Sequence, residues 1–375
     1  MPPTIAPTSA TSYPWAGPVL TDHPHLVRAL AQVKAAAAEA NGDAGTLGRE
    51  IAADLCWSAD HLLAQPGDAP KVALFLGGGG VAVNAAMNGW LGGPVANTSQ
   101  STADVLHTAA RVGVIDALQP ASASMGTLAC ELRHAATRWT DLAAETLART
   151  CLRDGIAVPT SVWPLGMAQA IERSITTLDG AAASLHQVVL GSTVVGTGSG
   201  AAPAYRKAVV PILARRTGLP LRPHPDPASA LQHGDDLLTL SGALVAAARV
   251  IARAAADVRL LASGPVGGFG ELVLLESGDG STFFANKTNP IDAETAIILA
   301  AQVQGLHTAN ETLASRGELH LNVFDLAVAV NLFTAISFVA TGSDALTNLI
   351  ASTDVDPQRC ATLAAAAHAP KDSTA

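Results

Sequence analysis

Three residues that could do chemistry share one polar loop in the last third of the chain. Ser281, Lys287 and Asn289 bring a hydroxyl, a cation and an amide together, just before a proline that begins a predicted helix. A serine hydroxyl is a poor base unless backbone donors and a nearby cation stabilise its anion. Lys287 could provide that charge and, with Asn289, bind a carboxylate; the alternative is an ordinary solvated loop lysine. The surrounding segment, 258–290, is long and rich in glycine, which is typical of functional loops.

Two other glycine-rich segments could offer backbone donors to a ligand. The segment 76–88, LGGGGVAVNAAMN, could form a strand, a turn and a helix amino terminus that hold a phosphate. A dinucleotide site needs more, namely specifically spaced glycines within alternating strands and helices, and no such alternation surrounds Gly77–Gly80. The segment 190–200 is equally compatible with close helix packing. A nucleotide-binding enzyme is therefore only a third interpretation.

The cysteines and histidines lack the spacing of a metal site. The cysteines lie far apart without a CxxC pair, at Cys56, Cys130, Cys151 and Cys360. No histidines are paired at the spacing of metal ligands. We therefore expect no metal, no cofactor and no disulfide framework.

Composition limits the partners of the chain. Only 14% of its 375 residues are charged, whereas 49% are apolar. The net charge of −9 offers no basic surface for nucleic acid. The most apolar stretch, 326–341, is interrupted by Asn331, so we expect a buried helix and no membrane span. A monomer with so few charges would expose adhesive patches, which predicts an oligomer.

The amino-terminal segment, 1–15, has neither the positive region nor the apolar core of a secretory signal. We expect it to be a loose tail. Together with the scattered cysteines, this predicts a cytoplasmic location.

Long segments rich in alanine and leucine predict an all-α fold. The expected helices cover 24–40, 47–63, 101–118, 125–153, 164–188, 203–217, 227–263, 290–315, 322–350 and a short stretch from 357. Their length favours an elongated helical bundle whose remaining apolar faces meet other subunits. We expect an amino-terminal helical domain (1–98), a central long-helix bundle (99–350) and a shortened carboxyl-terminal remnant (351–375).

Four segments resemble, in order, the motifs of the aspartase/fumarase superfamily. The segment 280–294, GSTFFANKTNPIDAE, is similar to its signature loop, G-S-S-x-M-P-x-K-x-N-P-x-x-x-E. The segments 99–109 (SQSTADVLHTA), 191–198 (GSTVVGTG) and 317–324 (GELHLNVF) resemble its other motifs. Because the match covers nearly the whole chain, the protein is identified as a divergent member of this superfamily.

The resemblance implies a tetrameric helix bundle, a homotetramer whose active sites are each built by three subunits. It also implies elimination, in which a base removes the proton next to a carboxylate and a leaving group departs from the neighbouring carbon. Ser281 would be the base, and Glu294 would be the acid that orients a histidine. The substrate-binding positions would be Lys287, Asn289, Asn84, Ser101 and Thr102.

Several positions depart from the family pattern. Val158 stands at the histidine of one motif, Val81 in the anion-binding S-G-T loop, and Ala103 at the asparagine of S-T-N-D. Val266 replaces the arginine of G-P-R. These side chains neither bind a carboxylate nor transfer a proton. His320 replaces an acidic residue of the family and is a candidate proton donor, although a hydrogen-bonded structural histidine is the simpler interpretation.

The leading hypothesis is a carbon–oxygen or carbon–nitrogen lyase that acts by β-elimination, or the reverse addition, through an aci-carboxylate intermediate. Its substrate would be a small carboxylic acid that is less polar on one side than aspartate or malate, so ordinary fumarase or aspartase activity is not expected. The alternative is a catalytically silent relative that acts as a structural or regulatory partner. Ser281 and Lys287 favour the enzyme, whereas Val158 and Val81 favour the silent relative.

Overall fold

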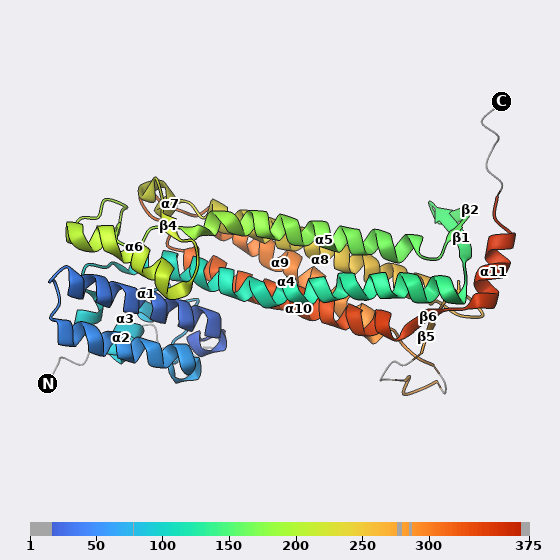
Figure 1. Cartoon of the computed structure of the whole chain (residues 1–375), viewed down its shortest axis with the longest axis horizontal. Helices are drawn as coiled ribbons and strands as arrows, with labels where there is room; N and C mark the ends of the chain where they lie inside the picture. Colours follow the sequence, from blue (N-terminus) through green and yellow to red (C-terminus); the bar gives the residue numbers. More distant parts are fainter. Residues whose placement is uncertain (1–16, 78, 276–279, 285–286, 369–375) are drawn as a thin grey trace, which may run out of the picture. The chain divides into compact units, whose positions relative to one another are not determined.

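The computed structural model describes residues 17–368 except residues 78, 276–279 and 285–286. Helices form most of this part of the chain, and its strands occur as short pairs (Figure 1). The mostly helical fold predicted from composition is therefore confirmed. The expected tail, residues 1–15, lies outside the described residues, as does Gly78 of the first glycine-rich segment.

Contacts within the chain divide it into two compact units. The first unit comprises Met1–Gln119, Gly180–Gly242 and Leu306–Thr334, and the second comprises Pro120–Asp179, Ala243–Gly305 and Ala335–Ala375. The domain boundaries predicted from the sequence stay predictions. Each unit is described separately below.

The first unit contains α1 (Pro24–Asp43), α2 (Arg49–Ala64), α3 (Val81–Leu91), α6 (Pro203–Thr217) and α7 (Pro227–Gln232). Helix α1 packs against both α2 and α6 (Figure 1). Most of α1 is buried, because its run of alanines lets neighbouring helices approach closely. Lys34 and Asn41 are the buried polar side chains of this helix.

Five long helices contribute residues to both units: α4 (Thr102–Leu142), α5 (Val162–Ala182), α8 (Asp235–Leu261), α9 (Ile291–Ala314) and α10 (Asp325–Ala351). In two places the predicted division of the chain into separate helices is wrong. Helix α4 continues through Pro120, where we expected two separate helices. The long helix expected over 227–263 is divided at His233 and Gly234, where α7 ends and α8 begins.

A hairpin replaces the end of the helix that we expected over 125–153. Strands β1 (Glu145–Thr150) and β2 (Arg153–Pro159) pair antiparallel, and Cys151 and Leu152 form the turn with φ of 54° and 59°. The hairpin packs against α11 (Pro357–Ala365) in the second unit (Figure 1).

The remaining regular elements are short. They are the pairs β3 (Gln187–Val188) with β4 (Arg222–Pro223) and β5 (Leu272–Leu274) with β6 (Thr353–Val355), and the 3-10 turns Leu20–Asp22, Pro66–Asp68, Pro94–Asn97 and Ala183–His186. Ahead of the first glycine-rich segment, Ala73 forms an isolated bridge with Val19.

Two helices, α8 and α10, are long and apolar enough to cross a membrane. Half of the most apolar window of α8 and 67% of that of α10 are buried within the chain. Mostly buried core helices of soluble proteins have the same length and hydropathy.

Candidate active site

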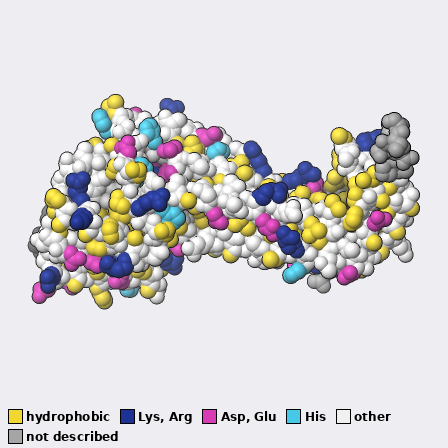
Figure 2. Space-filling model, turned by 45° about the horizontal axis from the view of Figure 1, so that its top comes forward, with side chains coloured by type: hydrophobic (Ala, Val, Ile, Leu, Met, Phe, Trp, Pro, Cys, Tyr) yellow, Lys and Arg dark blue, Asp and Glu magenta, His cyan; other side chains and the backbone are white. Residues whose placement is uncertain are grey.

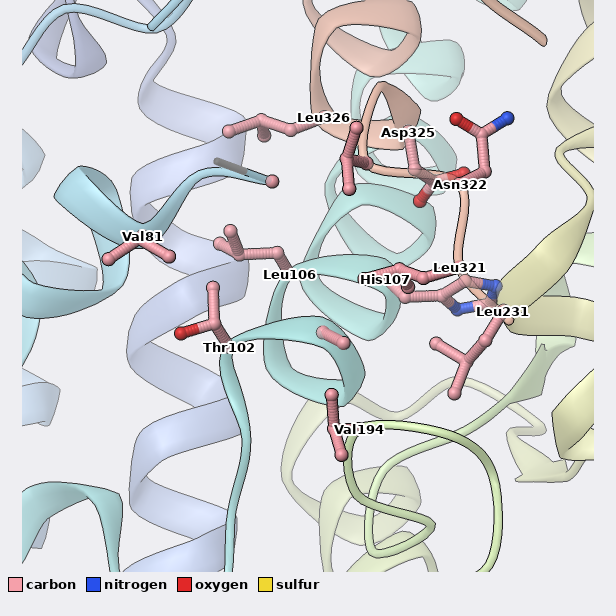
Figure 3. Close-up of a pocket in the computed structure, with 13 residues that line it drawn as sticks. Val81, Thr102, Leu106, His107, Val194, Leu231, Leu321, Asn322, Asp325 and Leu326 are labelled. Carbon is pink, nitrogen blue, oxygen red and sulfur yellow. The ribbon is translucent and has the colours of Figure 1, made fainter. Parts of the chain in front are cut away.

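A cavity of about 300 Å³ lies in the first unit at the amino-terminal end of α4 (Figure 3). Its polar lining consists of Thr102, His107, Asn322 and Asp325. The other lining residues are mostly apolar: Gly79, Val81, Ala103, Leu106, Val194, Leu231, Leu321, Val323 and Leu326. The cavity therefore brings together parts of the segments 76–88, 99–109, 191–198 and 317–324.

A reciprocal cap fixes the start of α4. The backbone N–H and the hydroxyl of Ser101 both donate to Asp104 Oδ1, at 2.8 Å and 3.2 Å. The backbone N–H of Asp104 donates in turn to Ser101 Oγ at 3.3 Å. Such a box satisfies donors that would otherwise be unpaired at a helix start. Ser101, a predicted substrate-binding residue, is therefore engaged in the cap and does not line the cavity.

Asp104 also fixes the loop 190–198. Its Oδ2 accepts the backbone N–H groups of Gly191 and Thr193 at 3.0 Å and 3.1 Å. Burial raises the pKa of the Asp104 carboxyl, while these donors and Ser101 oppose the rise. One buried carboxylate thus joins two motifs and places Val194 in the wall of the cavity.

Asn84 and Thr102, two predicted substrate-binding residues, lie side by side. Asn84 Nδ2 donates to Thr102 Oγ1 and to Asn97 Oδ1, both at 3.0 Å. Asn84 is only 3% exposed and does not line the cavity, whereas Thr102 does. Asn84 therefore supports Thr102 from behind the cavity wall.

Gly80 determines how closely α3 approaches the cavity. Its φ is +78°, and a Cβ atom at this position would clash with Leu106 and Leu326. Glycine is the residue that fits both constraints. The next residue, Val81, lines the cavity, so the anion-binding loop of the family presents an isopropyl group here.

Lys34, which no sequence motif indicated, lies behind this cluster. It is 3% exposed, and its Nζ donates to Asn97 Oδ1 at 3.0 Å and to Gln100 Oε1 at 3.1 Å. Burial lowers the pKa of Lys34 to about 7, and the charge of Asp104 partly opposes this shift. Among the described residues, Lys34 has no carboxylate within ion-pair distance.

His107 is a second residue that the sequence did not indicate. It is 5% exposed, and its Nε2 donates to the Ala230 carbonyl at 3.2 Å. Burial, followed by the charge of Arg111, lowers the pKa of His107 to about 4. The imidazole in the cavity wall is therefore neutral at physiological pH.

Within the first unit, Arg111 connects three long helices, α4, α8 and α10. Its side chain is buried and donates to both oxygens of Asp236, at 2.7 Å each, and to Asp325 Oδ2 at 2.7 Å. Asp236 lies in the first turn of α8 and Asp325 begins α10. The arginine thus fixes the starts of α8 and α10 against α4.

The second unit holds the residues predicted from the signature loop, whereas His320 belongs to the first unit. A broad open cavity of about 920 Å³ is lined by Lys287, Asn289 and Glu294, together with Arg259 and Asp356. The structure therefore brings together three of the residues predicted from the signature loop.

Ser281 is held in the same loop by backbone hydrogen bonds. Its N–H donates to the Lys287 carbonyl at 2.9 Å. Its Oγ accepts the N–H groups of Phe284 and Phe283, at 2.9 Å and 3.2 Å. Lys287 Nζ lies 5.5 Å from the centre of the Phe284 ring. Two backbone donors therefore converge on the hydroxyl oxygen.

Two acid–base candidates have surroundings that the sequence did not indicate. Glu294 accepts a hydrogen bond from Arg259 at 3.2 Å, and both side chains are about half exposed, so the pair is weak. His320 is exposed in a turn between Glu318 and Leu321 and does not line the cavity of the first unit. Their catalytic roles stay predictions.

The departures from the family pattern fall in both units. Val81 and Ala103 line the cavity of the first unit. Val158 lies on β2 opposite Thr146, and Val266 is fully exposed. In the part of the chain that the structure describes, no group of three or more histidine, cysteine or acidic residues could hold a metal ion.

Comparison with known proteins assigns the family. The chain matches the family model described as "Lyase" over residues 19–305. It is 32% identical over 348 residues to the class II fumarate hydratase of Chromobacterium violaceum. The aligned region covers 86% of this chain and 74% of that protein. It is 31% identical over 372 residues to a class II fumarate hydratase of Pseudomonas aeruginosa, and this aligned region covers 90% of this chain and 77% of that protein.

Solved structures agree on the fold. The fumarate lyase:delta crystallin of Brucella melitensis, in its cobalt-bound crystal structure, superposes with a TM-score of 0.87 at 25% identity, over 94% of this chain and 80% of that one. The recombinant class II fumarase of Schistosoma mansoni superposes with a TM-score of 0.86 at 20% identity, over 91% of this chain and 78% of that one. The protein thus has the fold of a helical lyase. It belongs to the lyase family, within the aspartase/fumarase superfamily, as a divergent member related to the class II fumarases.

Proposed function

We propose that the protein catalyses β-elimination, or the reverse addition, next to the carboxylate of a small acid, with Ser281 as the base. One observation carries the proposal: the backbone N–H groups of Phe283 and Phe284 both point at Ser281 Oγ. Donors placed in advance around an oxygen stabilise the negative charge that develops on it. A deprotonated Ser281 would therefore be supported by its own loop.

The loop also suggests how the reaction proceeds. Lys287 and Asn289 would bind the substrate carboxylate, since a cation and an amide donor suit its oxygens. Ser281 would remove the proton from the adjacent carbon, and the electron pair would delocalise into an aci-carboxylate. This pair then forms the carbon–carbon double bond as the leaving group departs from the next carbon with its bonding electrons.

The cavity of the first unit supports a substrate with a mostly apolar far end. Val81, Leu106 and Val194 form much of its wall, and Thr102 adds one hydroxyl. A second carboxylate here would be desolvated with few donors, which costs several kcal/mol. Malate and aspartate should therefore be poorer substrates than β-substituted monocarboxylates.

Assembly into a homotetramer with sites shared between subunits belongs to the same proposal. Hydrophobic side chains appear at many places on the visible face of the protein (Figure 2). Large apolar side chains are strongly exposed, among them Trp57, Phe283 and Leu319, at 75%, 85% and 87%. Subunit contacts would remove such surface from water.

We also propose a cytoplasmic location. The four cysteines are free, and Cys130 and Cys151 are exposed. Exposed thiols suit a compartment that keeps them reduced.

A substrate panel tests the reaction. L-malate, L-aspartate, 3-hydroxybutyrate, 3-aminobutyrate and 3-nitropropionate are incubated with the protein, and the conjugated alkene product is followed by its ultraviolet absorbance. We expect turnover of at least one of the three monocarboxylates, with malate and aspartate much slower. Fastest turnover of malate would contradict the proposed substrate class. No turnover and no binding of any acid would favour the silent relative.

A further inference from the structure

Lys34 is a buried cation that lacks a negative partner among the described residues. Its hydrogen-bond acceptors, Asn97 and Gln100, are both neutral amides. A buried ammonium without a counter-ion is unfavourable, and such groups occur preferentially at functional sites. Its position beside the cluster of Asn84 and Thr102 suggests what the charge does.

The polarity of Lys34 sets the orientation of a chain of hydrogen bonds. An ammonium group donates and cannot accept, so Asn97 must turn Oδ1 toward it. This leaves Asn97 Nδ2 to donate to the Gln100 carbonyl at 3.1 Å. Asn97 Oδ1 in turn requires Asn84 to present Nδ2, at 3.0 Å.

The chain of hydrogen bonds ends at the cavity. The second hydrogen of Asn84 Nδ2 goes to Thr102 Oγ1 at 3.0 Å. Because Thr102 accepts from Asn84, its own hydroxyl hydrogen is available for another acceptor, and none is found among the described residues. Thr102 lines the cavity of the first unit (Figure 3).

We propose that Lys34 is a positioning residue which, through Asn97 and Asn84, holds the Thr102 hydroxyl as a donor toward an electron-rich acceptor at the far end of the ligand. The inference rests on the proposed function only in taking this cavity as a substrate subsite. It assigns the site a specificity: one acceptor oxygen is favoured at a position that is otherwise apolar.

The same arrangement couples ligand binding to a proton. Within the described part of the chain, Asp104, on α4, is the one charged group that contributes to the pKa of Lys34, and its oxygens are occupied by Ser101, Gly191 and Thr193. Burial dominates and lowers the pKa of Lys34 to about 7. A ligand anion at Thr102 would raise this pKa, so its binding should take up a proton slightly above neutral pH.

Calorimetry with two probes tests the inference. Fumarate carries a carboxylate at its far end, whereas crotonate carries a methyl group there. In the wild type at about pH 8, fumarate binding should be accompanied by proton uptake, measured from the binding enthalpy in phosphate and Tris buffers. Lys34→Met should weaken fumarate binding about tenfold and abolish this uptake, while crotonate binding changes less than about twofold. The exposed Lys71→Met is the matched control.

A double-mutant cycle separates positioning from general damage. Thr102→Val removes the donor while keeping Lys34, so it should weaken fumarate binding even if Lys34→Met does not fold. If Lys34 acts through Thr102, the two losses are not additive. Additive losses, unchanged proton uptake in Lys34→Met, or no fumarate binding by the wild type would overturn the inference. Elimination activity is scored separately in the substrate panel, so Lys34-dependent binding without turnover would contradict the proposed function alone.

Discussion

At Ser281, the surrounding backbone would make the hydroxyl usable as the proposed base. The N–H groups of Phe283 and Phe284 donate to its oxygen and would stabilise a negative charge there, and Lys287 lies in the same loop. The sequence could indicate these residues because the motif is local and nearly continuous. It could not indicate Lys34, which stands in an alanine-rich helix and looks like a surface lysine until tertiary packing buries it.

The apolar character of the first cavity predicts a gain of function at Val81. Val81→Thr places a second hydroxyl near Thr102, so fumarate should bind roughly tenfold more tightly, the effect of one charge-assisted hydrogen bond. Crotonate binding should change little. Calorimetry on both ligands measures the shift, and Val95→Thr, outside the cavity, is the control. Equal effects on the two ligands would show that residue 81 does not contact the far end.

The lowered pKa of Lys34 predicts how the free energy of unfolding depends on pH. Its folded pKa is about 7, whereas its ordinary value is 10.5, so between these values the unfolded state binds more protons than the folded state. The free energy of unfolding should therefore rise with pH, by at most about 1.4 kcal/mol per pH unit from this residue. Urea denaturation at several pH values compares the wild type with Lys34→Met, which should lose this contribution. Identical slopes in the two proteins would contradict the assignment, and Lys71→Met should keep the wild-type slope.

Among the elements, α4 organises the first unit, since its first turns carry the cap, the cavity wall and Arg111.

The sequence predicts an element well where the residues at its ends have a strong local preference for a helix start or a turn. The prolines at the starts of α6 and α11 marked both helices correctly. The hairpin β1–β2 was missed because Cys151 and Leu152 occupy left-handed positions that usually take glycine or asparagine.

The Arg111 network predicts a large loss of stability at one position of α4. Arg111→Met leaves Asp236 and Asp325 without their shared cation, which should lower the free energy of unfolding by about 3–5 kcal/mol. Arg133→Met, on the same helix, breaks an exposed pair with Glu172 and should cost less than about 1 kcal/mol. Urea denaturation of the two variants and the wild type measures both losses in the free energy of unfolding. A similar small loss in both would mean that the buried network contributes little.

At the scale of the whole molecule, we expect an oligomer with sites shared between subunits. The residues proposed to function in catalysis and binding divide between two units of the chain, with Thr102 in the first and Ser281 in the second. Because the proposed sites combine residues from different subunits, the protein should behave as a tetramer of 37.9 kDa chains in light scattering. A mass of one chain would contradict this prediction.

Mixed oligomers test the sharing of sites. Thr102→Arg fills the first cavity and Ser281→Ala removes the base, so each variant alone should be inactive. Co-expressed, they should recover part of the wild-type elimination activity, because some sites then receive both intact residues. No recovery in hetero-oligomers confirmed by mass spectrometry would show that each site comes from one chain.

Proton exchange next to the carboxylate tests whether Ser281 is the base of an elimination reaction. The three monocarboxylates of the substrate panel are incubated in deuterium oxide, and loss of the C2 proton signal is followed by nuclear magnetic resonance. The wild type and the neighbouring Thr282→Ala should exchange this proton in at least one acid, while Ser281→Ala should not, although it still binds crotonate. Exchange by Ser281→Ala at the wild-type rate would show that Ser281 is not the base.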